Sequence, residues 1–289
     1  MGEDNLINDI CMNLQTKGDT TKDEIFLLPG IEGCGNIFYS LAPKIEAPAT
    51  CLQYGTYNID KNCNTVADIV DSIFKHMIQR IKSKQDFLII AYSYGTLIAI
   101  ELTRRLENMH FQGRLVFIDG APEQLRALLN QIIFGATTEE LENNILLSIM
   151  DILEPTISGK LFLELNKLIN WDDKLNMFVK LLPPLYMKFS AESMKSLCLT
   201  IYKHVQALYK YNITELPKIT SPVILLKPTT MSLNFPHEDY GLHKITTGNV
   251  QVHYIEGNHF SILYNDKVVA TINGQYIDVI YWYINNGKQ

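Results

Sequence analysis

The feature that most constrains the fold is an alternation along the chain between short apolar runs and longer segments with helical periodicity. Apolar runs without charged residues are typical of parallel strands that are covered on both faces. Apolar residues three and four positions apart are typical of amphipathic helices. The predicted strands are 25–28, 51–54, 87–90, 115–118, 223–226 and 250–255, and the predicted helices are 66–81, 94–109 and 272–282. Strands that alternate with helices predict an α/β fold, with a mostly parallel sheet between helices on both faces.

One long segment interrupts this alternation. Residues 123–215 contain no good strand; they are unusually apolar, have helical spacing and are punctuated by prolines. We therefore expect a helical cap subdomain at 123–215, inserted into an α/β core formed by residues 23–122 and 216–289. Residues 1–22 are polar, and we expect them to form a leader or linker.

Composition and charge exclude several classes of protein. The 289 residues carry 25 basic and 31 acidic side chains, a net charge of −6, without a block of Lys and Arg, so nucleic-acid binding is not expected. Five irregularly spaced cysteines predict neither a disulfide scaffold nor a zinc site, and they favour a reducing compartment. Residues 1–22 do not have the pattern of a signal peptide, and the longest charge-free apolar stretch, 87–100, is too short to span a membrane. We therefore predict a cytoplasmic chain with no transmembrane segment and no metal site.

A serine lies between the third predicted strand and the helix that follows it. The sequence Ala91-Tyr92-Ser93-Tyr94-Gly95 resembles the strained strand-to-helix turn that exposes a nucleophilic hydroxyl at the carboxyl edge of a sheet. Small residues two positions before and after the serine, here Ala91 and Gly95, let the strand and helix backbones approach each other closely. We therefore predict Ser93 as a nucleophile.

A serine hydroxyl is a poor nucleophile unless a base accepts its proton. His259 follows the last predicted strand in a loop at its carboxyl end, where hydrolases of this architecture place the base. We therefore predict His259 as the base. His76 on the long helix and His204 in the insertion are interpreted as surface or satisfied polar residues.

The base in turn needs a carboxylate to hold its tautomer and stabilise the imidazolium. Asp119 directly follows the predicted strand beside the nucleophile strand, and Glu238-Asp239 follow the next one. Asp119 precedes a glycine, so it also fits an ordinary turn. The residues by themselves leave the choice between Asp119 and Glu238-Asp239 open.

The negative charge that develops during attack needs two backbone N–H donors. One is the amide of Tyr94, directly after the nucleophile. We predict the other as the amide of Ile31, in the glycine-flanked loop after the first strand. Glu32 and Cys34 in the same loop are interpreted as bystanders.

Four short motifs occur in order and together resemble a known family. They are Leu28-Pro29-Gly30-Ile31-Glu32-Gly33, Ala91-Tyr92-Ser93-Tyr94-Gly95, Phe117-Ile118-Asp119-Gly120-Ala121-Pro122 and Ile255-Glu256-Gly257-Asn258-His259. Over residues 24–285, cap included, the chain resembles the C-terminal thioesterase domain of animal fatty acid synthase. The cap sequence is unlike that of vertebrate domains, which favours an invertebrate source.

The resemblance implies an α/β-hydrolase fold in which the acid follows the strand beside the nucleophile strand, so it favours Asp119. Ser93 then matches the nucleophile, His259 the base, and the amides of Ile31 and Tyr94 the oxyanion-hole donors. The implied activity is hydrolysis of a long-chain acyl thioester on the phosphopantetheine of an acyl carrier protein in cis. This reaction releases a free fatty acid and ends its synthesis. The resemblance also implies a substrate groove between core and cap and no cofactor within this domain.

Several alternatives remain open at this point. A free-standing type II thioesterase, which clears stalled carriers, or a carboxylesterase or lipase acting on oxygen esters would use the same three side chains. A non-catalytic binding protein of the same fold is a further alternative. The presence of Ser93, Asp119 and His259 together argues against that last alternative.

Overall fold

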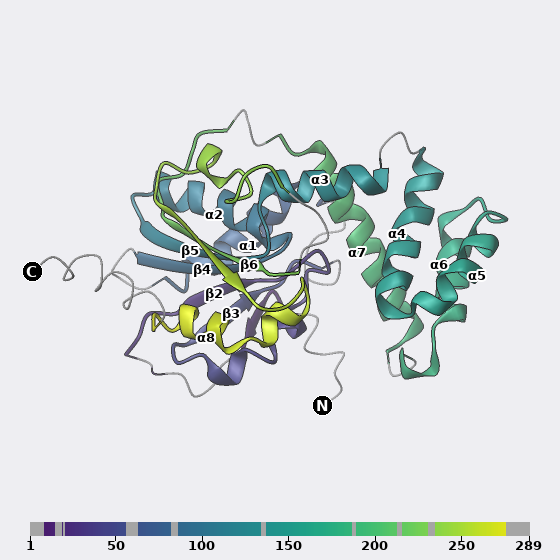
Figure 1. Cartoon of the computed structure of the whole chain (residues 1–289), viewed down its shortest axis with the longest axis horizontal. Coiled ribbons are helices and arrows are strands. Elements are labelled where there is room, and N and C mark those ends of the chain that lie inside the picture. Colours follow the sequence, from purple (N-terminus) through teal and green to yellow (C-terminus); the bar gives the residue numbers. More distant parts are fainter. Residues whose placement is uncertain are drawn as a thin grey trace, which may run out of the picture.

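A central, mostly parallel sheet organises the molecule (Figure 1). The computed structural model describes residues 9–14, 19, 21–55, 63–81, 86–133, 137–186, 189–212, 216–230 and 235–275. Within these ranges seven strands pair in the order β1-β3-β2-β4-β5-β6-β7, and every pairing is parallel except that of β1 with β3. The strands are β1 (Cys11–Asn13), β2 (Ile25–Leu28), β3 (Ala49–Leu52), β4 (Asp86–Tyr92), β5 (Gln112–Ile118), β6 (Val223–Pro228) and β7 (Val250–Ile255). The predicted α/β fold is confirmed.

The predicted strands are confirmed, with one of them shifted. The strand expected at 51–54 is β3, which begins and ends two residues earlier. Its pairing with β2 ends because the backbone turns away after Leu52, and Tyr54 N donates instead to Gly33 O in the loop beyond β2. Because β2 and β4 are parallel neighbours, the loop after β2 lies at the carboxyl edge of the sheet, beside the end of β4.

Helices cover both faces of the sheet. Helices α1 (Val66–Ile78) and α2 (Gly95–Asn108) pack on one face, and α8 (Asp266–Ile272) with two short 3₁₀ turns packs on the other. Thr65 and Asp68 form a capping box that begins α1. The helix ends at Ile78, three residues before the predicted end. Most of the helix predicted at 272–282 lies outside the described residues, and α8 ends where that prediction begins.

The N-terminal segment is not simply a loose leader. Cys11–Asn13 form β1, which pairs antiparallel with β3 and buries the side chain of Met12. The expectation of a leader over 1–22 is therefore wrong for these three residues. A strand this short carries no periodic signal, and its stability comes from pairing with residues about 40 positions away.

Within its described residues the insertion between β5 and β6 is mainly helical. It comprises α3 (Pro122–Ile133), α4 (Thr138–Leu153), α5 (Pro155–Leu165), α6 (Trp171–Leu181) and α7 (Ala191–Lys210), with a 3₁₀ turn at Pro184–Tyr186. Figure 1 shows α4, α5 and α6 to one side of the sheet. Helix α7 contacts α4 and α6 within the insertion and α1 in the core, so it joins the two parts. No helix in the described ranges is long and apolar enough to cross a membrane.

Candidate active site

Ser93 occupies the sharp turn between β4 and α2. Its φ of 51° lies in the left-handed region, which a residue with a side chain adopts only under local constraint. Ser93 N donates to Ile118 O, and the backbone N–H and the hydroxyl of Thr96 both donate to Ser93 O. A Cβ on Gly95 would lie 2.6 Å from Leu28 O, so only glycine lets α2 approach the end of β2 this closely. The turn has the strained geometry that the motif predicts.

Asp119 and His259 are brought together by a direct hydrogen bond. Asp119 directly follows β5 with a φ of 45°, and its Oδ2 lies 2.6 Å from His259 Nδ1. Its other oxygen, Oδ1, accepts hydrogen bonds from Gln124 Nε2 and Tyr240 Oη, each at 3.1 Å. The Asp119 side chain is almost fully buried. The carboxylate is thus held by three partners, and Nε2 of His259 is left for a reacting group.

The alternative acid has a different partner. Asp239 Oδ2 accepts a hydrogen bond from His243 N and lies 2.8 Å from His243 Nδ1, while its Oδ1 accepts from Gly241 N. These bonds hold the pKa of the Asp239 carboxyl below its usual value despite the opposing effect of burial. Asp239 therefore stabilises a turn after β6, and Asp119 is the carboxylate on His259.

His259 also lies beside the residue that precedes the nucleophile. The rings of Tyr92 and His259 stack with their centroids 4.9 Å apart, and Tyr92 Oη donates to His259 O. This packing places His259 at the same edge of the sheet as Ser93. Among the described residues no hydrogen bond joins Ser93 Oγ to His259, and such hydroxyl–imidazole contacts are often long until substrate binds.

The two predicted oxyanion donors are both available. Neither the amide of Ile31 nor that of Tyr94 donates a hydrogen bond within the described part of the chain. Tyr94 immediately precedes α2, where backbone N–H groups have no partner inside the helix. Ile31 lies in a tight turn closed by a bond from Gly33 N to Gly30 O, and Gly33 has a φ of 69°. Both amides can therefore bind an anionic oxygen.

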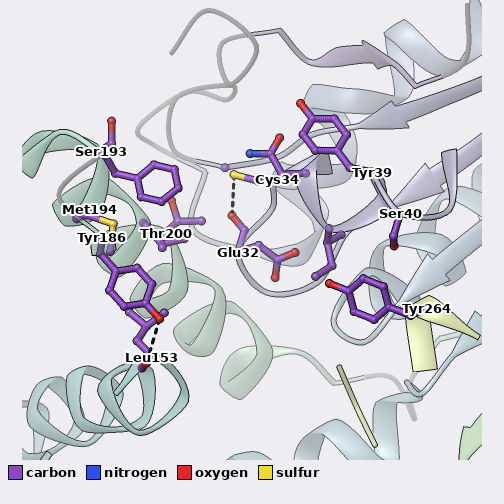
Figure 2. Close-up of a pocket in the computed structure, with 15 residues that line it drawn as sticks. Glu32, Cys34, Tyr39, Ser40, Leu153, Tyr186, Ser193, Met194, Thr200 and Tyr264 are labelled. Atoms are coloured by element: carbon purple, nitrogen blue, oxygen red, sulfur yellow. Dashed lines mark hydrogen bonds between the residues drawn. The ribbon is translucent and has the colours of Figure 1, made fainter. Parts of the chain in front are cut away.

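A cavity of about 700 Å³ lies between the loop after β2 and the helical insertion (Figure 2). This volume is within the range of sites that bind small organic ligands. Its core side is formed by residues after β2, by Gly55 after β3 and by Tyr264. Its cap side is formed by the end of α4, by α7 and by the segment before α7. The lining residues are Glu32, Cys34, Asn36, Ile37, Tyr39, Ser40, Gly55, Leu153, Tyr186, Phe189, Ser193, Met194, Leu197, Thr200 and Tyr264.

Sequence reasoning gave no role to several residues that the structure places at this site. Glu32 lies in the cavity wall, where burial raises the pKa of its carboxyl although Gly30 N donates to it. Burial likewise raises the pKa of the Cys34 thiol to about 12, so this cysteine is inert as a nucleophile at neutral pH. Tyr240 and Gln124 hold Asp119 from other segments. Their spacing from Asp119 follows no motif, so no local signal marks them.

The fold is that of the α/β hydrolases. A family model described as "Thioesterase domain" matches residues 23–140, a range that includes Ser93 and Asp119. This match ends before most of the helical insertion and before His259.

Solved structures of similar fold include thioesterases. A four-domain nonribosomal peptide synthetase bound to AMP and glycine superposes with a TM-score of 0.69 at 19% identity, over 94% of this chain and 20% of that one. The chain thus spans about a fifth of the synthetase's length. The type II thioesterase BorB from the borrelidin biosynthetic cluster has a TM-score of 0.60 at 15% identity, over 90% of this chain and 93% of BorB. The RedJ thioesterase of the prodiginine pathway in Streptomyces coelicolor has a TM-score of 0.59 at 13% identity, over 88% and 90%.

Proposed function

We propose that this chain is a serine thioesterase that hydrolyses a long-chain acyl thioester held on the phosphopantetheine arm of an acyl carrier protein. The observation that carries the proposal is the hydrogen-bonded Asp119–His259 pair at the same sheet edge as Ser93, beside two available amides. The thioesterase family match over 23–140 supports the choice of a thioester over other acyl substrates.

In the first half of the reaction the acyl group moves to the enzyme. Ser93 Oγ attacks the thioester carbonyl carbon while His259 Nε2 takes the hydroxyl proton, and Asp119 stabilises the resulting imidazolium. The amides of Ile31 and Tyr94 bind the oxyanion of the tetrahedral intermediate. The carbon–sulfur bond then breaks, and His259 returns the proton to the leaving thiol of the carrier arm.

In the second half a water molecule takes the place of the thiol. His259 accepts a proton from this water as its oxygen attacks the acyl-serine carbonyl, and the same two amides bind the oxyanion. The bond to Ser93 breaks, the serine regains its proton from His259, and a free fatty acid leaves. These steps draw on side chains, backbone amides and water, and we propose no resident cofactor in this domain.

The cavity supports a long acyl chain as the substrate. It adjoins Ile31 through its neighbour Glu32, and most of the remaining lining is apolar or aromatic. Each buried methylene contributes about 0.8 kcal/mol, so two to three methylenes change binding by roughly 15- to 60-fold. A cavity of limited length can therefore select among chains without polar contacts. We place this activity at the end of fatty acid synthesis, with the carrier protein in cis.

A type II editing thioesterase is the second candidate. It is favoured by the likeness in fold to BorB, a type II thioesterase. The two functions differ in substrate range, because an editing enzyme must accept varied short acyl groups, whereas a chain-terminating enzyme favours one length.

Hydrolysis of acyl-CoA thioesters from C2 to C20 tests these proposals. We compare the wild type with Ser93→Ala and with a control, Ser148→Ala, whose hydroxyl bonds to a carbonyl within α4. A profile that peaks at one long chain and depends on Ser93 but not Ser148 supports chain termination. A flat, Ser93-dependent profile with short chains favours editing. Turnover of glycerol esters without thioester turnover would indicate a carboxylesterase, and full activity of Ser93→Ala would refute the serine mechanism.

A further inference from the structure

We propose that His204 is a positioning residue for the oxyanion hole, which holds the Ile31 peptide from helix α7 and so links the acyl cavity to the reacting centre. This inference rests on the proposed function. It concerns a histidine of the helical insertion that the catalytic steps above do not use.

His204 contacts both residues whose amides form the proposed oxyanion hole. Its Nδ1 lies 2.6 Å from Ile31 O, and its ring stacks on Tyr94 with centroids 5.0 Å apart and planes 15° apart. The Tyr54 ring lies against it at 5.5 Å. The side chain is 3% exposed, so these contacts enclose it almost completely.

The hydrogen bond has a defined direction. Burial lowers the pKa of His204 to about 4, although hydrogen bonds with the backbone of Ile31 and Tyr54 oppose this effect, so the ring is neutral at pH 7. A carbonyl oxygen can only accept, and the proton is therefore assigned to Nδ1. His204 Nδ1–H thus donates to Ile31 O.

This bond completes a set of contacts that hold the oxyanion loop. Gly30 O accepts a hydrogen bond from Gly33 N, and the Tyr54 hydroxyl, which donates to Pro29 O, also lies 3.2 Å from Gly30 O. These contacts orient the peptide that contains the Ile31 amide. The bond from His204 orients the next peptide, so the backbone is held on both sides of the Ile31 Cα. Tyr54 and Gly33 belong to the core, whereas His204 belongs to the insertion.

Helix α7 connects this contact to the cavity. Ser193, Leu197 and Thr200 line the cavity, and His204 continues the same face of the helix at spacings of four, three and four residues. An acyl chain that packs against this face holds α7, and α7 holds the Ile31 peptide through His204. A longer acyl chain therefore stabilises the transition state and also binds more tightly.

The test compares His204→Phe, which keeps a ring on Tyr94 but has no donor, with His204→Asn, whose amide nitrogen can replace Nδ1. Gln206→Ala is the control on the same helix; its side chain bonds to Tyr202 on α7. Steady-state rates are measured with C8 and C16 acyl-CoA, together with inhibition by a long-chain alkylboronic acid. The serine adduct of that inhibitor places an oxygen in the oxyanion hole.

We expect His204→Phe to lower kcat for the C16 substrate roughly 10- to 100-fold, with KM nearly unchanged and boronate affinity reduced by a similar factor. The advantage of C16 over C8 in kcat should disappear, and His204→Asn should restore most of both losses. Gln206→Ala should behave as wild type.

Three results would overturn the inference. The first is a His204→Phe variant with the kcat and boronate affinity of the wild type. The second is a His204→Phe variant in which only KM changes. The third is a His204→Asn variant that folds but has a kcat no higher than that of His204→Phe. If His204→Phe does not fold, His204→Gln, which sets the amide one carbon further out, is compared with Asn, and equal activity of the two would overturn it. A Ser93-dependent wild type with an unaffected His204→Phe refutes this inference only, whereas activity independent of Ser93 refutes the proposed function.

Discussion

Lowering the pH from 7 to 4 should lower the free energy of unfolding because of one buried side chain, that of His204. Its pKa is lowered to about 4 in the folded chain by burial, from 6.5 when exposed. Between these values the unfolded chain binds more protons than the folded one, so the contribution is fully present above pH 6.5 and is lost as the pH falls towards 4. The difference between the two pKa values corresponds to about 3 kcal/mol in the free energy of unfolding.

Urea unfolding at pH 4, 5, 6 and 7 measures this effect, with His204→Phe as the reference. Other titrating groups act equally in both proteins, so the difference in free energy of unfolding between them isolates His204. Relative to His204→Phe, the free energy of unfolding of the wild type should fall by about 3 kcal/mol from pH 7 to pH 4. Most of this loss should occur between pH 6.5 and 4. A difference that stays the same at all four pH values would show that His204 is not buried in the neutral form.

Four further predictions concern the turn, helix α5, the acid and the cavity. Gly95→Ala should destabilise the fold by about 3 kcal/mol, because the new Cβ would lie 2.6 Å from a backbone carbonyl oxygen. Gly159→Ala in α5, with open space around it, should stabilise it by about 1 kcal/mol, as urea midpoints would show. Asp119→Asn should lower kcat by about 10⁴-fold, whereas Asp239→Asn should not change it. Leu197→Trp should shift the preferred acyl chain to shorter lengths by filling the cavity. Equal urea midpoints for the two glycine variants would contradict the packing argument. Equal kcat values for the two aspartate variants would contradict the role of Asp119, and an unchanged chain-length profile for Leu197→Trp would contradict the role of the cavity.

Local patterns were sufficient for the elements that bury a regular face. The helix that begins at Val66 has an apolar stripe and a capping box. Both depend only on residues that are close in sequence, and the helix begins where they indicate. Five consecutive residues likewise predict the turn at Ser93. Its strain and close packing are consequences of the local sequence of strand, serine, glycine and helix.

Contacts between distant segments could not be predicted in the same way. The choice between Asp119 and Asp239 depends on which of them meets His259, a contact across 140 residues that no spacing encodes. The role of His204 depends on a hydrogen bond to Ile31 across 173 residues, and a histidine on an amphipathic helix gives no sign of it. Such positions become visible only when the sheet and the insertion are assembled.

The pairing of β1 with β3 also determines how the chain can be shortened. β1 satisfies backbone groups along the outer edge of β3, and Ile10 and Leu14 beside it add hydrogen bonds to Gln53 and Ala49. An uncovered strand edge offers its N–H and C=O groups to strands of other molecules and promotes aggregation. A shortened protein that starts at residue 23 would keep every residue of the candidate site, yet it would expose a sheet edge through which its copies could join into insoluble assemblies.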